Sequence, residues 1–145
     1  MKNNILKYTY LEWLSAEEMH ETIKQWLSEL NFIKDEQLFL NDLVQSYTRQ
    51  LIDTSFFKES KNTIINLKKL EDDLGPLLKM VQKHEKQLEI MVDTIDQLEM
   101  EKAYLETHKK LIVAISTYIE KNRAIKKELF KIVSLAIKKD KRLLH

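Results

Sequence analysis

The chain has 145 residues and a formal net charge of +1, and it contains one Gly, one Pro and no Cys. Phosphate-binding glycine loops, dinucleotide-binding fingerprints and nucleophile elbows need several glycines at fixed spacings, so the composition excludes them. It also excludes disulfides, thiolate metal sites and cysteine nucleophiles, and it leaves too few turn formers for a hairpin-rich β fold. We therefore expect an all-α protein, with a single domain over residues 1–145.

The balance of apolar and charged residues is typical of a soluble helical protein. Hydrophobic residues make up 43% of the chain and charged residues 32%, and no run approaches the roughly 18 apolar residues that a membrane span needs. The N-terminus lacks the apolar segment and cleavage site of a signal peptide. Together with the missing cysteines, this favours a cytoplasmic protein. Lys outnumbers Arg by 21 to 3, which suggests an AT-rich bacterial genome.

The first periodic segment follows Ser15, which forms a capping-box pattern with Glu18. Apolar residues then recur at alternating steps of four and three, the spacing that keeps one face of a helix toward its neighbours; we call such positions a heptad stripe. This stripe predicts a helix over approximately 15–56, preceded by a short helix over 9–14. Its positions are Met19, Ile23, Trp26, Leu30, Ile33, Gln37, Leu40, Val44, Tyr47 and Leu51.

A second stripe, from Leu67 to Leu105, predicts a helix over approximately 60–106, after a turn at 53–62 where polar cap-forming residues cluster. The only Gly and the only Pro, Gly75-Pro76, lie inside this stripe. The pair is a helix-stop signal, yet the stripe keeps its phase across it, which favours a kinked helix over a turn. A kink predicts an elongated antiparallel bundle of three long helices, whereas a true turn predicts a four-helix bundle.

The third stripe predicts a helix over approximately 108–140, because the phase shifts by about one residue near 106–110. A single helix over 76–138 would be about 95 Å long, which also favours a turn at 106–110. The third helix carries apolar residues outside its stripe, so we expect it to be central in the bundle or to form an oligomer interface. Val113, Phe130 and Ile137 are the interface candidates.

Charge is distributed unevenly along the chain. Residues 1–106 hold 13 Lys or Arg and 20 Asp or Glu, whereas residues 107–145 hold 11 and 3. Such asymmetry can indicate a surface that binds nucleic acid or another polyanion. Because aromatic residues do not alternate with the basic ones as in single-strand binders, we favour a basic helix that packs beside two acidic ones.

Few residues suggest metal chemistry. Glu17 and His20 form one Glu-x-x-His pair, and di-iron carboxylate bundles use two such pairs. The pair also lies at a helix start, where Glu is expected because of the helix dipole, so a metal-dependent bundle is only an alternative.

Four polar residues occupy heptad-stripe positions. Such residues commonly set register and oligomer state, and a buried histidine among them can also serve as a ligand or a pH-sensitive switch. The four are Gln37, His84, Lys102 and Asn122.

No pattern in the sequence indicates catalytic residues, a resident metal or a bound cofactor. We therefore expect a non-enzymatic interaction or scaffold protein that binds a protein partner through its helical faces and self-associates. The alternatives are a metal-dependent, di-iron-like bundle and a nucleic-acid binder that uses the basic C-terminal helix.

Overall fold

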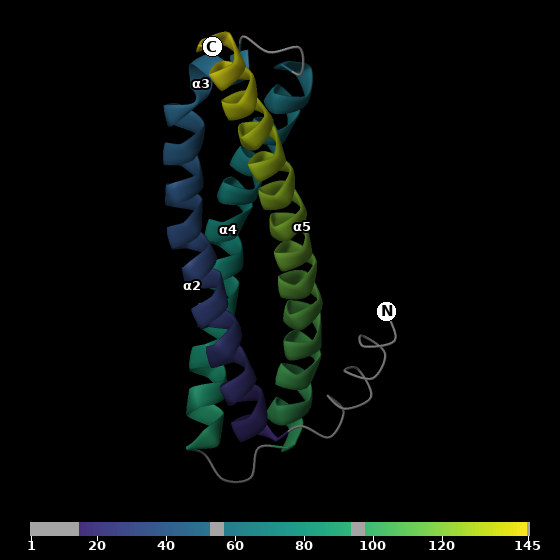
Figure 1. Ribbon diagram of the computed structural model, residues 1–145. Coiled ribbons are helices and arrows are strands. Elements are labelled where there is room, and N and C mark those ends of the chain that lie inside the picture. Colours follow the sequence, from purple (N-terminus) through teal and green to yellow (C-terminus); the bar gives the residue numbers. More distant parts are fainter. Residues whose placement is uncertain (1–14, 53–56, 94–97, 145) are drawn as a thin grey trace. The chain divides into compact units, whose positions relative to one another are not determined.

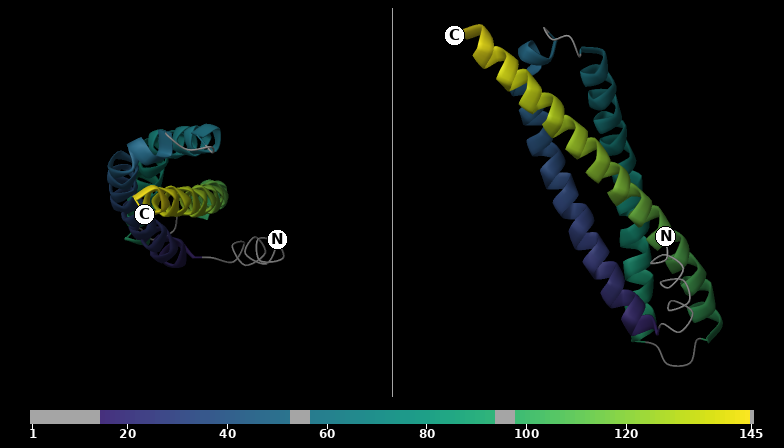
Figure 2. Two further views of the ribbon diagram at one scale, coloured as in Figure 1. Left: turned by 45° about the horizontal axis from the view of Figure 1, so that its top comes forward. Right: turned by 45° about the vertical axis from the view of Figure 1, so that its right-hand side comes forward.

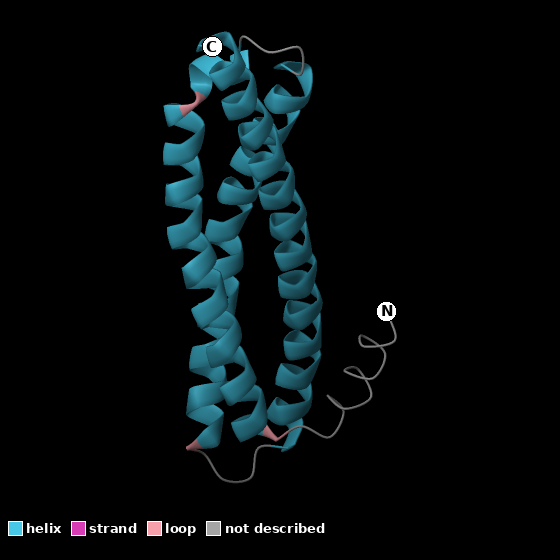
Figure 3. Cartoon of the chain, viewed as in Figure 1, coloured by secondary structure: helices cyan, strands magenta, loops and turns pink. Residues whose placement is uncertain are grey.

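The computed structural model describes residues 15–52, 57–93 and 98–144, and helices account for 97% of them. The helices are α2 (Ala16–Ser46), α3 (Thr48–Ile52), α4 (Phe57–Val92) and α5 (Leu98–Leu144) (Figure 1). Within these ranges there is no strand (Figure 3). The protein is an all-α helical bundle, as expected. The short helix predicted over 9–14 lies outside the described residues.

The chain forms two compact units, and each long helix contributes one segment to each unit. Unit 1 comprises residues 1–31 and 75–117, and unit 2 comprises residues 32–74 and 118–145. Within each unit the α2 and α5 segments run in the same direction and the α4 segment runs in the opposite direction (Figure 2). This is the up-down-up connectivity of three antiparallel helices. That the chain is a single domain stays a prediction.

Helix α2 begins at the predicted capping box. The Glu18 amide donates to Ser15 Oγ at 3.2 Å, and the Ser15 amide donates to Glu18 Oε1 at 3.5 Å. The stripe that follows is buried as predicted, with Met19, Ile23 and Leu30 at most 1% exposed. Local capping and burial of one face therefore define this helix together.

The first helix is shorter than the predicted 15–56, because α2 ends at Ser46 and a turn at Tyr47 separates it from α3. The Tyr47 amide lies 3.2 Å from the Leu43 carbonyl and 3.3 Å from the Val44 carbonyl, and the Thr48 hydroxyl also donates to the Val44 carbonyl. Sharing of one donor between two carbonyls tightens the last turn of a helix. The stripe nevertheless continues to Leu51, which is buried.

Helix α4 begins at Phe57, so the turn predicted at 53–62 is wrong for residues 57–62; residues 53–56 lie outside the described part of the chain. The helix continues through Pro76, and the four-helix alternative with a turn at Gly75-Pro76 is wrong. Gly75 has no Cβ, which removes part of the clash that proline imposes on the residue before it in a helix. Buried leucines on both sides of the pair, Leu74 and Leu77, keep the helix against its neighbours.

The break between the second and third helices lies earlier than predicted. Helix α4 ends at Val92 rather than near 106, and α5 begins at Leu98 rather than 108. The Asp93 amide donates to the Ile90 carbonyl at 3.2 Å, a three-residue closure typical of a helix end. The turn predicted at 106–110 is wrong, because these residues are helical. The segment contains no Gly or Pro that would end the helix.

Each unit has its own buried side chains. In unit 2, a hydrophobic cluster joins α2, α3, α4 and α5; it consists of Leu40, Leu51, Leu67, Leu129, Ile132, Val133 and Ala136. In unit 1, the buried apolar residues include Met19, Ile23, Leu30, Val81, Leu88, Met91, Leu111, Ile112 and Ile115. Among the described helices, none is both long and apolar enough to cross a membrane.

Candidate functional site

Unit 1 contains a pair of buried histidines that two different helices bring together. His84 of α4 is 1% exposed and His108 of α5 is 0% exposed. Nε2 of His84 lies 3.1 Å from Nδ1 of His108, and the rings of His84 and Tyr104 form a T-shaped pair with centroids 6.5 Å apart. One of the two facing nitrogens must therefore carry the proton and donate it to the other.

The two outer ring nitrogens of this pair, Nδ1 of His84 and Nε2 of His108, have no hydrogen-bond partner among the described residues. Burial lowers the pKa of His84 to about 4, and burial followed by the charge of His84 lowers the pKa of His108 to about 4. Burial has this effect because a charged imidazolium loses its hydration. Both rings are therefore neutral at pH 7, and neither has the pKa near 7 that suits a general base.

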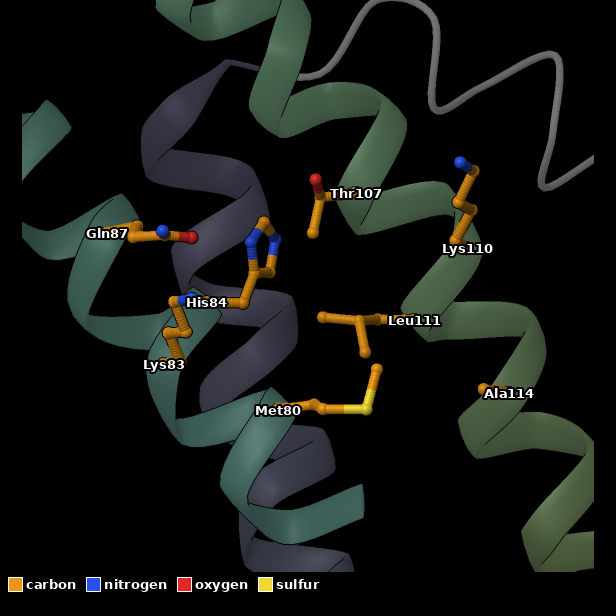
Figure 4. Close-up of a pocket in the computed structure, with 8 residues that line it drawn as sticks. All are labelled: Met80, Lys83, His84, Gln87, Thr107, Lys110, Leu111 and Ala114. Carbon is orange, nitrogen blue, oxygen red and sulfur yellow. The ribbon is translucent and has the colours of Figure 1, made fainter. Parts of the chain in front are cut away.

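A cavity of about 360 Å³ lies beside the histidine pair, between α4 and α5 in unit 1. Figure 4 shows the His84 ring in this cavity, between Gln87, Thr107 and Leu111. The lining also includes Met80, Lys83, Lys110 and Ala114. The volume is near the lower limit of ligand pockets, and the lining has their usual mixture of apolar walls with a few polar groups.

A second polar group in unit 1 joins α2 to α4. Nε2 of His20 lies 3.0 Å from Oε1 of Glu85, and both side chains are partly buried. The exposed Glu89 lies one turn further along α4, and the three residues can place one ligand atom each within 4.8 Å of one another. Glu17, which the sequence paired with His20, is exposed and does not belong to this group.

Unit 2 contains a buried hydrogen-bond chain from α2 through α5 to α4. Nε2 of Gln37 donates to the Tyr118 hydroxyl at 2.9 Å, and that hydroxyl donates to the Leu70 carbonyl at 2.6 Å. Burial raises the pKa of Tyr118; the hydrogen bond from Gln37 lowers it, and the charges of Asp73 and Glu71 raise it. The hydroxyl therefore stays protonated and acts as a structural link between three helices.

The four polar residues predicted at stripe positions differ in burial. Gln37, His84 and Asn122 are buried, and Oδ1 of Asn122 has no hydrogen-bond partner among the described residues. Lys102 is exposed, so its assignment to a stripe position of the second helix is wrong. It lies in the first turns of α5, a different helix from the one that carries His84.

The interface candidates differ in exposure. Val113 is exposed in unit 1, Phe130 is exposed in unit 2, and Ile137 packs in part against the hydrophobic cluster of unit 2. Larger apolar side chains are exposed on α2, where Phe32 and Phe39 keep 66% and 61% of their surface in solvent.

The basic segment contributes an ion pair between α5 and α2 within unit 2. Nζ of Lys126 lies 3.1 and 3.2 Å from the two carboxylate oxygens of Glu36, and both side chains are partly buried. Lys109 and Glu106 pair along α5 itself.

Three residues of these groups were not predicted from the sequence: His108, Glu85 and Glu89. His108 lies three residues before Leu111, so it extends the α5 stripe backward once the helix is known to begin at Leu98. Glu85 and Glu89 carry no such signal, because acidic residues are common on exposed helix faces. Their proximity to His20 appears only when α2 packs against α4.

Comparison of the chain with protein-family models, with curated proteins and with solved structures finds no match.

Proposed function

We propose that this chain is a non-enzymatic interaction protein, and that its helical bundle associates with a second copy of itself. The observation that carries the proposal is a group of exposed phenylalanines on one flank of unit 2. Phe32 and Phe39 on α2 and Phe130 on α5 are 66%, 61% and 43% exposed. We call these three residues the phenylalanine patch.

The Glu36–Lys126 ion pair locates the patch on the flank where α2 meets α5. Phe32 and Phe39 lie four residues before and three residues after Glu36, and Phe130 lies four residues after Lys126. Residues three or four apart lie one above the other on a helix. Because α2 and α5 run in the same direction in unit 2, Phe39 and Phe130 lie about one turn past the ion pair on the same side.

Apolar groups gathered in this way mark interaction surfaces. Full burial of one such side chain contributes about 1.5–3 kcal/mol. In a dimer with a two-fold axis, each patch residue is buried twice, since both copies present the same surface.

Charge supports a second copy as the partner. The patch is flanked on α2 by the exposed Asp35 and on α5 by the exposed Arg123 and Lys127. A two-fold axis parallel to the helices brings α2 of one copy over α5 of the other. Asp35 of one copy then faces the basic residues on α5 of its partner, which favours this pairing over unrelated surfaces.

Sedimentation velocity of the full chain and two variants tests the proposal. Phe39→Glu places a charge in the patch and is expected to weaken the dimer at least about tenfold, since burial of the exposed parts of two phenylalanines is lost. Ile65→Glu is the matched control, because Ile65 of α4 is 55% exposed in the same unit and lies outside the patch; it is expected to leave association unchanged. Equal association of the wild type and Phe39→Glu would contradict the proposal.

The polyanion alternative predicts a different result. A protein that uses its basic residues on nucleic acid binds DNA fragments with a steep dependence on salt. Such binding by a monomeric wild-type chain would favour that alternative over self-association.

We also propose that the protein works in the cytoplasm. The support is the absence of cysteine from all 145 residues, since disulfides are the usual stabilising device of small secreted domains. Localisation of a tagged chain in the source cell checks this.

A further inference from the structure

We propose that His20, Glu85 and Glu89 bind a divalent first-row transition metal ion, with zinc as the best match to their donor atoms. The site lies in unit 1, and it is independent of the phenylalanine patch and of self-association. Its three ligand atoms lie within 4.8 Å of one another.

The distances suit a metal with short bonds. Zinc binds histidine nitrogen and carboxylate oxygen at about 2.0–2.2 Å, so its ligand atoms are separated by roughly 3–4 Å. Nε2 of His20 and Oε1 of Glu85 already lie 3.0 Å apart. Glu89 is exposed, so a rotation of its side chain can bring its carboxylate to the remaining position without disturbing the core.

The helices pre-arrange the ligands. Glu85 and Glu89 are four residues apart on α4 and therefore lie on the same face of that helix. His20 comes from the first turns of α2. A bound ion would therefore link α2 to α4, and its affinity would add to the stability of unit 1.

The donor set defines the class of ion. A neutral imidazole and two carboxylates supply a charge of −2, which balances a divalent cation. Imidazole nitrogen suits zinc and its neighbours in the first transition row, whereas magnesium and calcium prefer oxygen ligands alone. Three protein ligands leave the fourth position of a tetrahedral ion for water.

Lys24 shows that this region already attracts positive charge. Its Nζ lies 2.8 Å from Oε1 of Glu21. The hydrogen bond and charge of Glu21 raise the pKa of Lys24 most, and the charges of Glu85 and Glu89 raise it further. A metal ion between His20 and the two glutamates would be repelled by this ammonium group, so Lys24 limits the affinity of the site.

Zinc titration of the untagged full chain, with a chromophoric chelator as competitor, tests the proposal. The wild type is expected to bind one zinc ion per chain, and Glu89→Gln is expected to bind it at least about tenfold more weakly. Glu17→Gln is the matched control, because it removes one exposed carboxylate three residues from His20 that lies outside the cluster; its affinity should equal that of the wild type. Lys24→Gln should bind zinc more tightly than the wild type.

Thermal unfolding supplies a second measurement. Zinc at about a hundredfold excess over its dissociation constant should raise the unfolding midpoint of the wild type by about 5–10 °C, and it should raise that of Glu89→Gln much less. The proposal is overturned if no stoichiometric zinc binding is found. It is also overturned if Glu17→Gln and Glu89→Gln weaken binding equally, which would indicate general attraction to acidic residues.

Discussion

Each unit of the bundle contains a buried group of polar side chains that are joined by hydrogen bonds. In unit 1 the His84–His108 pair shares one hydrogen bond at 3.1 Å, and in unit 2 Tyr118 receives a hydrogen bond from Gln37 and donates one to Leu70. Each group joins different helices. Because a buried polar atom that loses its partner is costly, these residues make stability sensitive to pH and to single-atom changes.

The histidine pair predicts a loss of stability in mild acid. The pKa values of His84 and His108 are lowered from 6.5 to about 4 in the folded chain. Between pH 6.5 and 4 the unfolded chain therefore binds protons that the folded chain does not, and the free energy of unfolding falls as the pH falls. Each histidine contributes a slope of about 1.4 kcal/mol per pH unit within this window, and none below it.

Urea unfolding at a series of pH values measures this slope. The variant with both His84→Leu and His108→Leu lacks the two titrating groups, so it should lose less stability between pH 6.5 and 4 than the wild type does. Identical pH dependence of the two proteins would show that the histidines are not buried in the neutral form.

Tyr118→Phe removes the hydroxyl that links three helices. The substitution leaves Nε2 of Gln37 without its acceptor in a buried position. We expect a loss of about 1–3 kcal/mol in the free energy of unfolding. In the double variant with Gln37→Leu, the loss should be smaller than the sum of the two single losses, because both polar partners are then absent. Strict additivity in urea unfolding would contradict a shared hydrogen bond.

At the scale of single residues, the sequence predicted which stripe positions are buried more readily than which residues they contact. The reason is physical. Gln37, His84 and Asn122 are buried because a heptad stripe faces the core whatever its residue type. The stripe cannot say which residue of another helix each one meets. The contacts of His84 with His108, and of His20 with Glu85, depend on helix packing and were therefore not predicted.

The long helix α4 shows how burial outweighs a local stop signal. A proline inside a helix costs about 3 kcal/mol. Leu74, Leu77, Leu78 and Val81 are all buried around Gly75-Pro76, and burial of each contributes about 1.5–3 kcal/mol. A turn at this pair would interrupt that face, so the continuous stripe was the stronger signal.

Pro76→Ala is expected to stabilise the protein by as much as ~3 kcal/mol. The substitution gives residue 76 an amide that can donate to the Asp72 carbonyl, and it removes the clash of the proline ring with that carbonyl. Pro76 is exposed, so the change removes no core packing. Urea unfolding measures the effect, with Lys79→Ala on the same helix as a control that should change stability by less than about 0.5 kcal/mol. A destabilised Pro76→Ala protein would show that unit packing requires the proline.

The helix boundaries were harder to predict than the helices. The stripe continues without a phase change from Met91 past residue 93, where α4 has ended, so periodicity alone hides the break. Asp93, Thr94 and Asp96 are residues that favour helix ends and caps, and they were the available signal. The phase change near 106–110 does not mark a helix break, since α5 continues from Leu98 to Leu144.

On the scale of the whole molecule, the low glycine content is explained by three long helices. Each of these helices contributes one segment to each compact unit. The bundle fold followed from the stripes. The exposed phenylalanines of α2 did not, because a stripe identifies only the buried face of a helix. Phe32 and Phe39 lie outside its stripe, and the proposed association depends on them together with Phe130 of α5.

The central claim is that two copies associate through the phenylalanine patch, and the mass of the wild-type chain in solution tests it most directly. Light scattering coupled to size-exclusion chromatography, at micromolar concentration and moderate salt, should give twice the 17.4 kDa of one chain. The mass should fall toward that of one chain on dilution or in Phe39→Glu. A mass of 17.4 kDa for the wild type at every micromolar concentration would contradict the account.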